Sequence, residues 1–180
     1  MSIGAQVHLE RIERGTQLYH FSLDGVASVK SVDLSADSLM MVMGLDNQGK
    51  GAVVLFEASG ASRMRHHWDH DKSVWAVRFS PNVQMIAAAG YDMCVTLYSV
   101  STYTTLQKIK YTPLGGPAFI WSLAWSADSS RMALGCWNTY AYLYSCSQPN
   151  DSETPDRSPS PEGKTSPLTE ISAVKRQDRV

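Results

Sequence analysis

The densest group of side chains with possible chemistry is the run HHWDHD at residues 66–71. It contains three histidines and two aspartates, and imidazole and carboxylate groups are common Zn²⁺ ligands. Consecutive residues of a strand, however, point to alternating faces of a sheet, whereas metal ligands must converge. Two interpretations follow: a metal-dependent enzyme that uses His66, His67 and His70, or an outer strand that leads into a loop. We favour the interpretation as an outer strand, and we predict that the chain binds no metal ion and no other cofactor.

The elements around this run recur along the chain. Residues 74–82 (VWAVRFSPN) match residues 120–128 (IWSLAWSAD) 46 positions later, and residues 29–37 (VKSVDLSAD) 45 positions earlier. Each copy predicts an apolar inner strand, a Ser-containing turn, a strand of small residues, a β-branched and aromatic strand, and a more polar outer strand. Four short antiparallel strands in about 45 residues are typical of a β-propeller blade.

The motifs of this unit resemble the WD-repeat (WD40) family. The matching stretches, within about residues 5–146, are HDKSVWAVRFSPN, AAAGYDMCVTLYS, SVDLSAD, VVLFEA, IWSLAWSAD and AYLYSC. The resemblance implies that His70 and Asp92 are structural blade positions, with Asn138 replacing the Asp of the third copy. Tyr98 and Tyr144 stand where the family has Trp. It also implies a contact between His70 and Asp92 that braces the loop before the inner strand.

We therefore expect an all-β fold in residues 1–146, with about three WD40-like blades plus half a blade. Such an array is an incomplete propeller, because propellers have about four to eight blades. The half blade is expected in AQVHLERI and TQLYHFSL, and the third blade is expected to lack its outer strand, which residues 17–23 could supply. Residues 147–180 begin with a Pro- and Ser-rich stretch and should form a disordered tail.

Large aromatic residues recur at the blade period. Trp75 and Trp121 are equivalent, as are Phe79 and Trp125. They could form stacking platforms for nucleotides or methylated lysine. We expect them to pack between blades instead, because the burial of aromatic side chains dominates such cores.

The expected tail contains four residues that precede proline. Proline-directed kinases act on such Ser-Pro and Thr-Pro pairs, and a phosphate would add strong negative charge. The candidates for phosphorylation are Thr154, Ser158, Ser160 and Ser166.

Composition narrows the class of partner and the compartment. The net charge is -1 and the positive residues are scattered, which argues against nucleic acid and anionic membranes as partners. The sequence begins without the apolar run of a signal peptide and has no uninterrupted stretch of about 18 apolar residues. Its three cysteines form no CxxC motif, which favours a reduced compartment, the cytoplasm or the nucleus.

Three functional hypotheses result. The favoured one is a non-catalytic WD-repeat scaffold that mediates protein–protein interaction within an intracellular complex. Its partners would be proteins or peptides, and another chain or another copy could complete the propeller. The alternatives are a truncated fragment of a larger WD-repeat protein without independent activity, and the metal-dependent enzyme.

Overall fold

A computed structural model describes residues 5–11, 16–23, 26–58, 63–110, 119–137, 140–146 and 168–175. The regular elements in these segments are fourteen β-strands. In the described part of the chain, no helix is long and apolar enough to cross a membrane.

The strands form one two-stranded sheet and three four-stranded sheets, all antiparallel. The two-stranded sheet consists of β1 (Ala5–Arg11) and β2 (Thr16–Leu23). Blade 1 consists of β3 (Ser28–Leu34), β4 (Met40–Asn47), β5 (Lys50–Glu57) and β6 (Met64–His70). Blade 2 consists of β7 (Val74–Phe79), β8 (Met85–Gly90), β9 (Cys94–Ser99) and β10 (Thr105–Lys110). Blade 3 consists of β11 (Ile120–Trp125), β12 (Arg131–Cys136), β13 (Tyr140–Cys146) and β14 (Leu168–Lys175).

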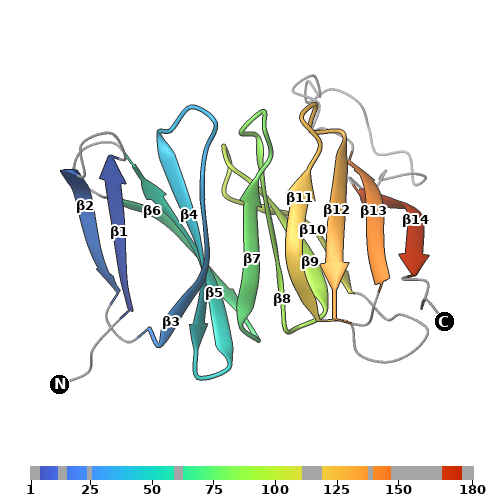
Figure 1. The fold of residues 1–180 in the computed structure, drawn as a ribbon, viewed down its shortest axis with the longest axis horizontal. Helices are drawn as coiled ribbons and strands as arrows, with labels where there is room; N and C mark the ends of the chain where they lie inside the picture. Colours follow the sequence, from blue (N-terminus) through green and yellow to red (C-terminus); the bar gives the residue numbers. More distant parts are fainter. Residues whose placement is uncertain are drawn as a thin grey trace, which may run out of the picture.

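The sheets stand side by side in chain order (Figure 1). The first strands of the blades, β3, β7 and β11, contact one another in turn, and the later strands of each blade lie progressively further from this row. This arrangement confirms the prediction of an all-β array of propeller blades that include a partial one.

The core lies between successive blades. Between blades 1 and 2 the buried residues include Val42, Leu55, Trp68, Val77, Phe79 and Tyr98. Between blades 2 and 3 they include Ala87, Val95, Leu97, Leu123, Leu134 and Tyr144. Every residue of β8 and β9 is buried, because blade 2 is covered on both faces. The small side chains of β8 (MIAAAG) suit this crowded position.

A turn that begins with a serine, here called the seryl turn, joins the first and second strands of every blade. Ser80 accepts a hydrogen bond from the Met85 amide at 2.9 Å and donates one to Asn82 at 2.7 Å. Ser35 and Ser126 make the same two kinds of bond in blades 1 and 3. This hydrogen-bonded turn therefore recurs in all three blades and sets the spacing between their first and second strands.

Blade 1 is less well covered at its inner strand than the other blades. Val32 is 41% exposed, whereas its equivalents Val77 and Leu123 are 0% and 4% exposed. Leu34 is also 41% exposed, whereas its equivalent Phe79 in blade 2 is 6% exposed. Blade 1 therefore presents apolar surface where blades 2 and 3 are packed.

The end of the chain differs from expectation. Residues 147–180 were predicted to be disordered throughout, but β14 pairs with β13 from Cys146↔Leu168 to Tyr140↔Lys175 and gives blade 3 its outer strand. The physical reason is local composition: Pro167 ends the proline-rich stretch, and LTEISAVK contains leucine, isoleucine and valine. Residues 17–23 do not supply this strand, because β2 pairs with β1 at the other end of the array (Figure 1). Residues 147–167 lie outside the described residues.

Candidate functional site

The HHWDHD run forms the end of β6 and the turn after it, and the strand alternation separates its side chains. The His66 ring stacks on Tyr103, with centroids 5.1 Å apart. His70 is buried on the side that faces blade 2, whereas His67 Nε2 lies 2.9 Å from Asp69 Oδ1 on the other side. Among the described residues no three His, Cys, Asp or Glu side chains are placed to hold one metal ion.

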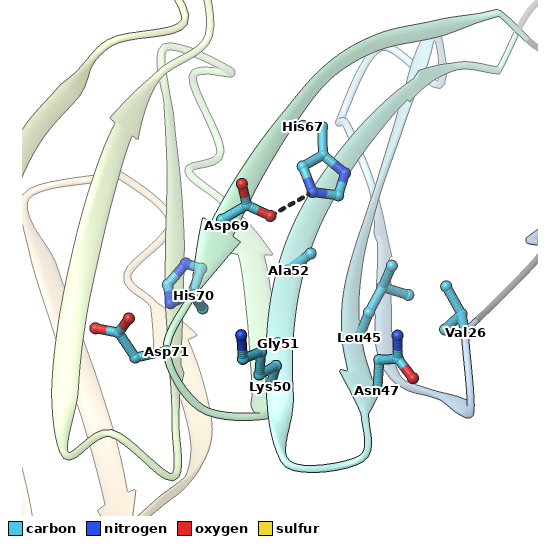
Figure 2. Close-up of a pocket in the computed structure, with 10 residues that line it drawn as sticks. All are labelled: Val26, Leu45, Asn47, Lys50, Gly51, Ala52, His67, Asp69, His70 and Asp71. Carbon is cyan, nitrogen blue, oxygen red and sulfur yellow. Dashed lines mark hydrogen bonds and ion pairs between the residues drawn. The ribbon is translucent and has the colours of Figure 1, made fainter.

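A cavity of about 510 Å³ lies on the His67 side of the strand (Figure 2). The lining of the cavity is partly apolar and partly polar. Its residues are Val26, Leu45, Asn47, Lys50, Gly51, Ala52, His67, Asp69, His70 and Asp71. The His67–Asp69 pair in it is solvent-exposed. Exposed ion pairs of this kind contribute little free energy.

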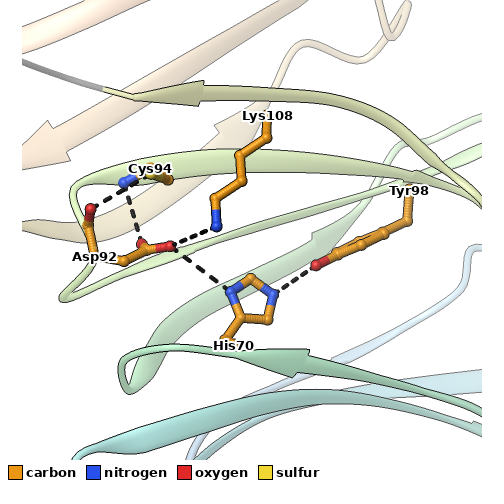
Figure 3. Close-up of polar contacts among 5 residues, drawn as sticks. All are labelled: His70, Asp92, Cys94, Tyr98 and Lys108. Atoms are coloured by element: carbon orange, nitrogen blue, oxygen red, sulfur yellow. Dashed lines mark hydrogen bonds and ion pairs between the residues drawn. The ribbon is translucent and has the colours of Figure 1, made fainter.

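His70 is the centre of a polar network that joins two blades (Figure 3). The hydroxyl of Tyr98, on β9 of blade 2, lies 2.6 Å from His70 Nε2. Asp92 Oδ2 lies 3.9 Å from His70 Nδ1 and 3.5 Å from Lys108 Nζ, and Asp92 Oδ1 accepts a 3.1 Å hydrogen bond from the Cys94 amide. The structure thus brings together three residues that the sequence marked as blade positions, His70, Asp92 and Tyr98.

The protonation states in this network follow from burial and charge. Burial raises the pKa of the Tyr98 hydroxyl, and the nearby Asp92 charge adds to the increase. Tyr98 therefore stays protonated, and its hydroxyl forms the hydrogen bond with His70 Nε2. Burial alone would raise the pKa of Asp92, but His70, the Cys94 amide and Lys108 together lower it. Asp92 is thus a carboxylate that faces the Nδ1 side of the imidazole.

The remaining predicted positions are placed only in part. Tyr144, on β13, is buried in the core between blades 2 and 3, at the position equivalent to Tyr98. Asn138 lies outside the described residues. The phosphorylation candidates Thr154, Ser158, Ser160 and Ser166 also lie outside them.

The cysteine side chains are poor candidates for nucleophiles. Burial raises the pKa of Cys136 to about 11 and that of Cys146 to about 12. Burial also raises the pKa of Cys94, and the Asp92 charge acts in the same direction. A thiol is nucleophilic as its thiolate, so these groups are largely inert near neutral pH.

A second candidate site arises from a β-bulge at the same place in all three inner strands. The sequence suggested Trp75 and Trp121 as possible stacking platforms, but the bulge was not predicted. The strand registers skip Lys30, Trp75 and Trp121, which occupy equivalent positions. A bulge leaves one residue outside the ladder and redirects its side chain. In blades 2 and 3 the bulged residue is a tryptophan at the rim where β7 and β11 begin.

Each of these tryptophans stacks on an aromatic residue of the turn after the second strand of its blade. Trp75 lies 6.3 Å from Tyr91 and Trp121 lies 5.3 Å from Trp137, both with an interplanar angle of 27°. Trp75 and Trp121 meet edge to face at 4.3 Å, which joins the two pairs. Phe119 stacks on Tyr91 at 3.9 Å. We call these five residues the aromatic strip.

The aromatic strip is open to solvent. Tyr91, Trp121 and Trp137 are 45%, 41% and 66% exposed. A shallow hollow of about 430 Å³ is lined by Trp121, Ser122, Gly135, Cys136 and Trp137. The prediction that Trp121 is buried between blades is therefore wrong. Because Trp121 is the bulged residue, its side chain does not follow the alternation of buried and exposed faces along β11. Trp125, at the other end of β11, does pack against the core between blades 2 and 3.

Comparisons with known proteins agree with this architecture. Residues 62–99 match the WD40 family model, described as WD domain, G-beta repeat. The chain is 29% identical over 96 residues to Coronin-7 of Mus musculus, covering 52% of this chain and 10% of that protein. It is 28% identical over 129 residues to Actin-interacting protein 1 of Drosophila melanogaster, covering 69% of this chain and 20% of that protein. The chain thus spans a fifth or less of the length of either relative. It contains a WD repeat, and its resemblance to the WD-repeat family is confirmed.

Proposed function

We propose that this chain is a non-catalytic WD-repeat scaffold that binds protein or peptide partners in the cytoplasm or nucleus. The observation that carries the proposal is the aromatic strip. Trp75 and Trp121 are held by β-strands, and the rings of the strip stack on one another, so they can bind a partner with little loss of side-chain entropy. Tyr and Trp are also the residue types that most often dominate protein interfaces.

The exposure of the strip supports an interaction role. The exposed fractions of Tyr91, Trp121 and Trp137 correspond to roughly 300–400 Å² of surface. This area lies within the usual range of the largest apolar patch on a soluble monomer, and such patches are often functional. Burial of these rings by a partner would remove this apolar area from water.

The chemistry of the other polar groups supports a non-catalytic role. His70, Asp92 and Tyr98 are engaged in bracing the contact between blades 1 and 2. The thiols are largely protonated near neutral pH. The scattered positive charge argues against nucleic acid and membrane surfaces as partners.

A further part of the proposal is that another chain or another copy completes the propeller beside blade 1. The support is the exposure of Val32 and Leu34 at positions that the neighbouring blade covers in blades 2 and 3. Light scattering of the purified chain tests self-assembly: a mass above that of one chain is expected if a copy covers this surface. The mass of one compact monomer would contradict self-assembly.

The interaction role can be tested by partner retention. Immobilised wild-type chain and a Trp121→Ala/Trp137→Ala variant are compared in a quantitative pull-down from cell extract, with Leu39→Ala as the control. Leu39 is exposed in the turn between β3 and β4, away from the strip. We expect specific partners to be lost from the double variant and retained by Leu39→Ala. Equal recovery by all three proteins would contradict the proposal.

Actin is the first defined partner to test, because one relative carries the name Actin-interacting protein 1. Co-sedimentation with filaments measures binding directly. If actin is a partner, the wild-type chain should sediment with filaments and the double variant should remain in solution. An equal distribution of both proteins would exclude the strip as an actin-binding surface.

A further inference from the structure

We propose that the aromatic strip binds a proline-rich segment of a partner protein in the polyproline II conformation. This inference rests on the proposed function and names the class of partner. Aromatic-lined grooves recognise such segments in several unrelated domains, because proline rings pack on flat aromatic surfaces and the ligand is already ordered.

The first argument is the repetition of the strip. Blades 2 and 3 each contribute a bulged tryptophan stacked on a turn aromatic, Trp75 with Tyr91 and Trp121 with Trp137, at the same interplanar angle of 27°. Trp121 and Tyr91 lie 4.3 and 6.3 Å from the Trp75 ring. The rings of the two blades therefore form one continuous aromatic surface through Trp75 and Trp121. A ligand with a regular repeat of prolines can pack on both pairs of rings.

The second argument is charge. Lys30, the bulged residue of blade 1, places its ammonium group 5.4 Å from the centroid of Trp75. A methylated lysine would be repelled by this cation, although aromatic faces otherwise attract such groups. Single-stranded nucleic acid also requires a groove with several cations along its backbone. Lys30 is the one cation that the described contacts of the strip include, and it is paired with Asp46 at 3.6 Å. An uncharged, apolar ligand fits these surroundings better.

The third argument is size. Stable interfaces between folded proteins bury about 800 Å² on each partner. The exposed rings offer roughly 300–400 Å², less than half of that area. The strip suits a short segment rather than a folded domain. A flexible segment would lose conformational entropy on binding, and a preformed polyproline II helix loses less.

The indole N–H signals in a ¹H–¹⁵N NMR spectrum of the full chain give a direct test. The probe is a synthetic decaproline peptide, and the control is a decapeptide of alternating glutamine and alanine. We expect decaproline to shift the indole signals of Trp121 and Trp137 in a saturable manner, with little change at buried Trp68. Trp121→Ala and Trp137→Ala should each weaken binding at least ten-fold, and Leu39→Ala should not.

A conservative variant separates contact from folding. Trp137→Phe keeps an aromatic surface, so it should weaken binding less than Trp137→Ala while the dispersion of the amide signals stays unchanged. The inference is overturned if decaproline gives no shift, if the glutamine–alanine peptide gives the same shift, or if both alanine variants bind as well as wild type. Binding of a trimethyl-lysine peptide but not of decaproline would also overturn it. That outcome would leave the proposed protein-binding role intact, because the strip would still bind a peptide.

Discussion

The hydroxyl of Tyr98 lies 2.6 Å from Nε2 of His70, so a strand of blade 2 is bonded to the last strand residue of blade 1. Both side chains are buried, and the raised pKa of Tyr98 keeps its proton available for this bond. The tyrosine at this position therefore contributes a polar contact between blades in addition to its apolar surface.

Tyr98→Phe should destabilise the fold by about 1–3 kcal/mol, because it leaves a buried imidazole nitrogen without its hydrogen-bond partner. Urea unfolding followed by fluorescence measures the loss. The control is Tyr103→Phe, which keeps the ring that stacks on His66 and should change the unfolding free energy by about 0.5 kcal/mol or less. Equal losses in the two variants would show that the Tyr98–His70 bond contributes nothing.

Asp92→Asn should alter the dependence of stability on pH. The folded state lowers the pKa of Asp92 below its ordinary 3.8, so the carboxylate stabilises the fold above that pH, and this contribution is lost as pH falls through the folded-state pKa. The gap in unfolding free energy between wild type and Asp92→Asn should therefore be full near neutral pH and should narrow in acid. Asp69→Asn, at an exposed ion pair, should follow the wild-type curve throughout. A gap that stays constant down to about pH 2 would contradict the role of Asp92.

The seryl turns predict a contrast between buried and exposed copies of one motif. Ser80→Ala removes the acceptor of the buried Met85 amide and should cost about 1–3 kcal/mol. Ser126→Ala removes the same bond to the Arg131 amide at an exposed site, where water can replace it, and should cost less than about 1 kcal/mol. Thermal or urea unfolding distinguishes the two, and a larger loss for Ser126→Ala would contradict the explanation.

The inner strands predict a second contrast. Val77→Ala should cost about 2 kcal/mol, since Val77 is fully buried between blades, whereas Val32→Ala should cost less than about 1 kcal/mol. If another copy covers blade 1, Val32→Ala should also lower the mass measured by light scattering at a fixed concentration. An effect of Val32→Ala on stability as large as that of Val77→Ala, without a change in mass, would contradict both expectations.

The HHWDHD run predicts an outcome for metal analysis. Elemental analysis of the purified chain after incubation with Zn²⁺ and desalting should find no stoichiometric metal, because the histidines point to opposite faces of β6. Joint replacement of His66, His67 and His70 by alanine should reduce stability mainly through His70. Stoichiometric zinc in the wild type that disappears in a folded triple variant would restore the enzyme hypothesis.

The blades were predictable because apolar alternation and turn residues recur at a nearly constant period. The registers 74–82, 120–128 and 29–37 place the inner strands β7, β11 and β3 correctly. The contact between His70 and Tyr98 was not predicted in detail, because it depends on how two blades pack. β14 was missed because it follows a long proline-rich stretch, although LTEISAVK itself has strand composition.

The exposure of Trp121 was missed for a different reason. Alternation assigns every strand residue to one of two faces, and a bulged residue belongs to neither. The sequence did contain a signal: the position equivalent to Trp75 and Trp121 is Lys30 in blade 1, and a lysine is rarely compatible with a fully buried site. A second signal was that Trp137 in blade 3 occupies the position equivalent to Tyr91 in blade 2, so both copies have an aromatic residue there.

Because of the bulge in each inner strand, selection for partner binding can act on one residue while selection for folding acts on its neighbours. A residue outside the hydrogen-bond ladder can be exchanged without disturbing strand register, while its neighbours Val74 and Ile120 stay buried in the core. Lysine in blade 1 and tryptophan in blades 2 and 3 illustrate the range that this position accepts. Binding preference can therefore diverge one blade at a time by single substitutions, at little risk to folding.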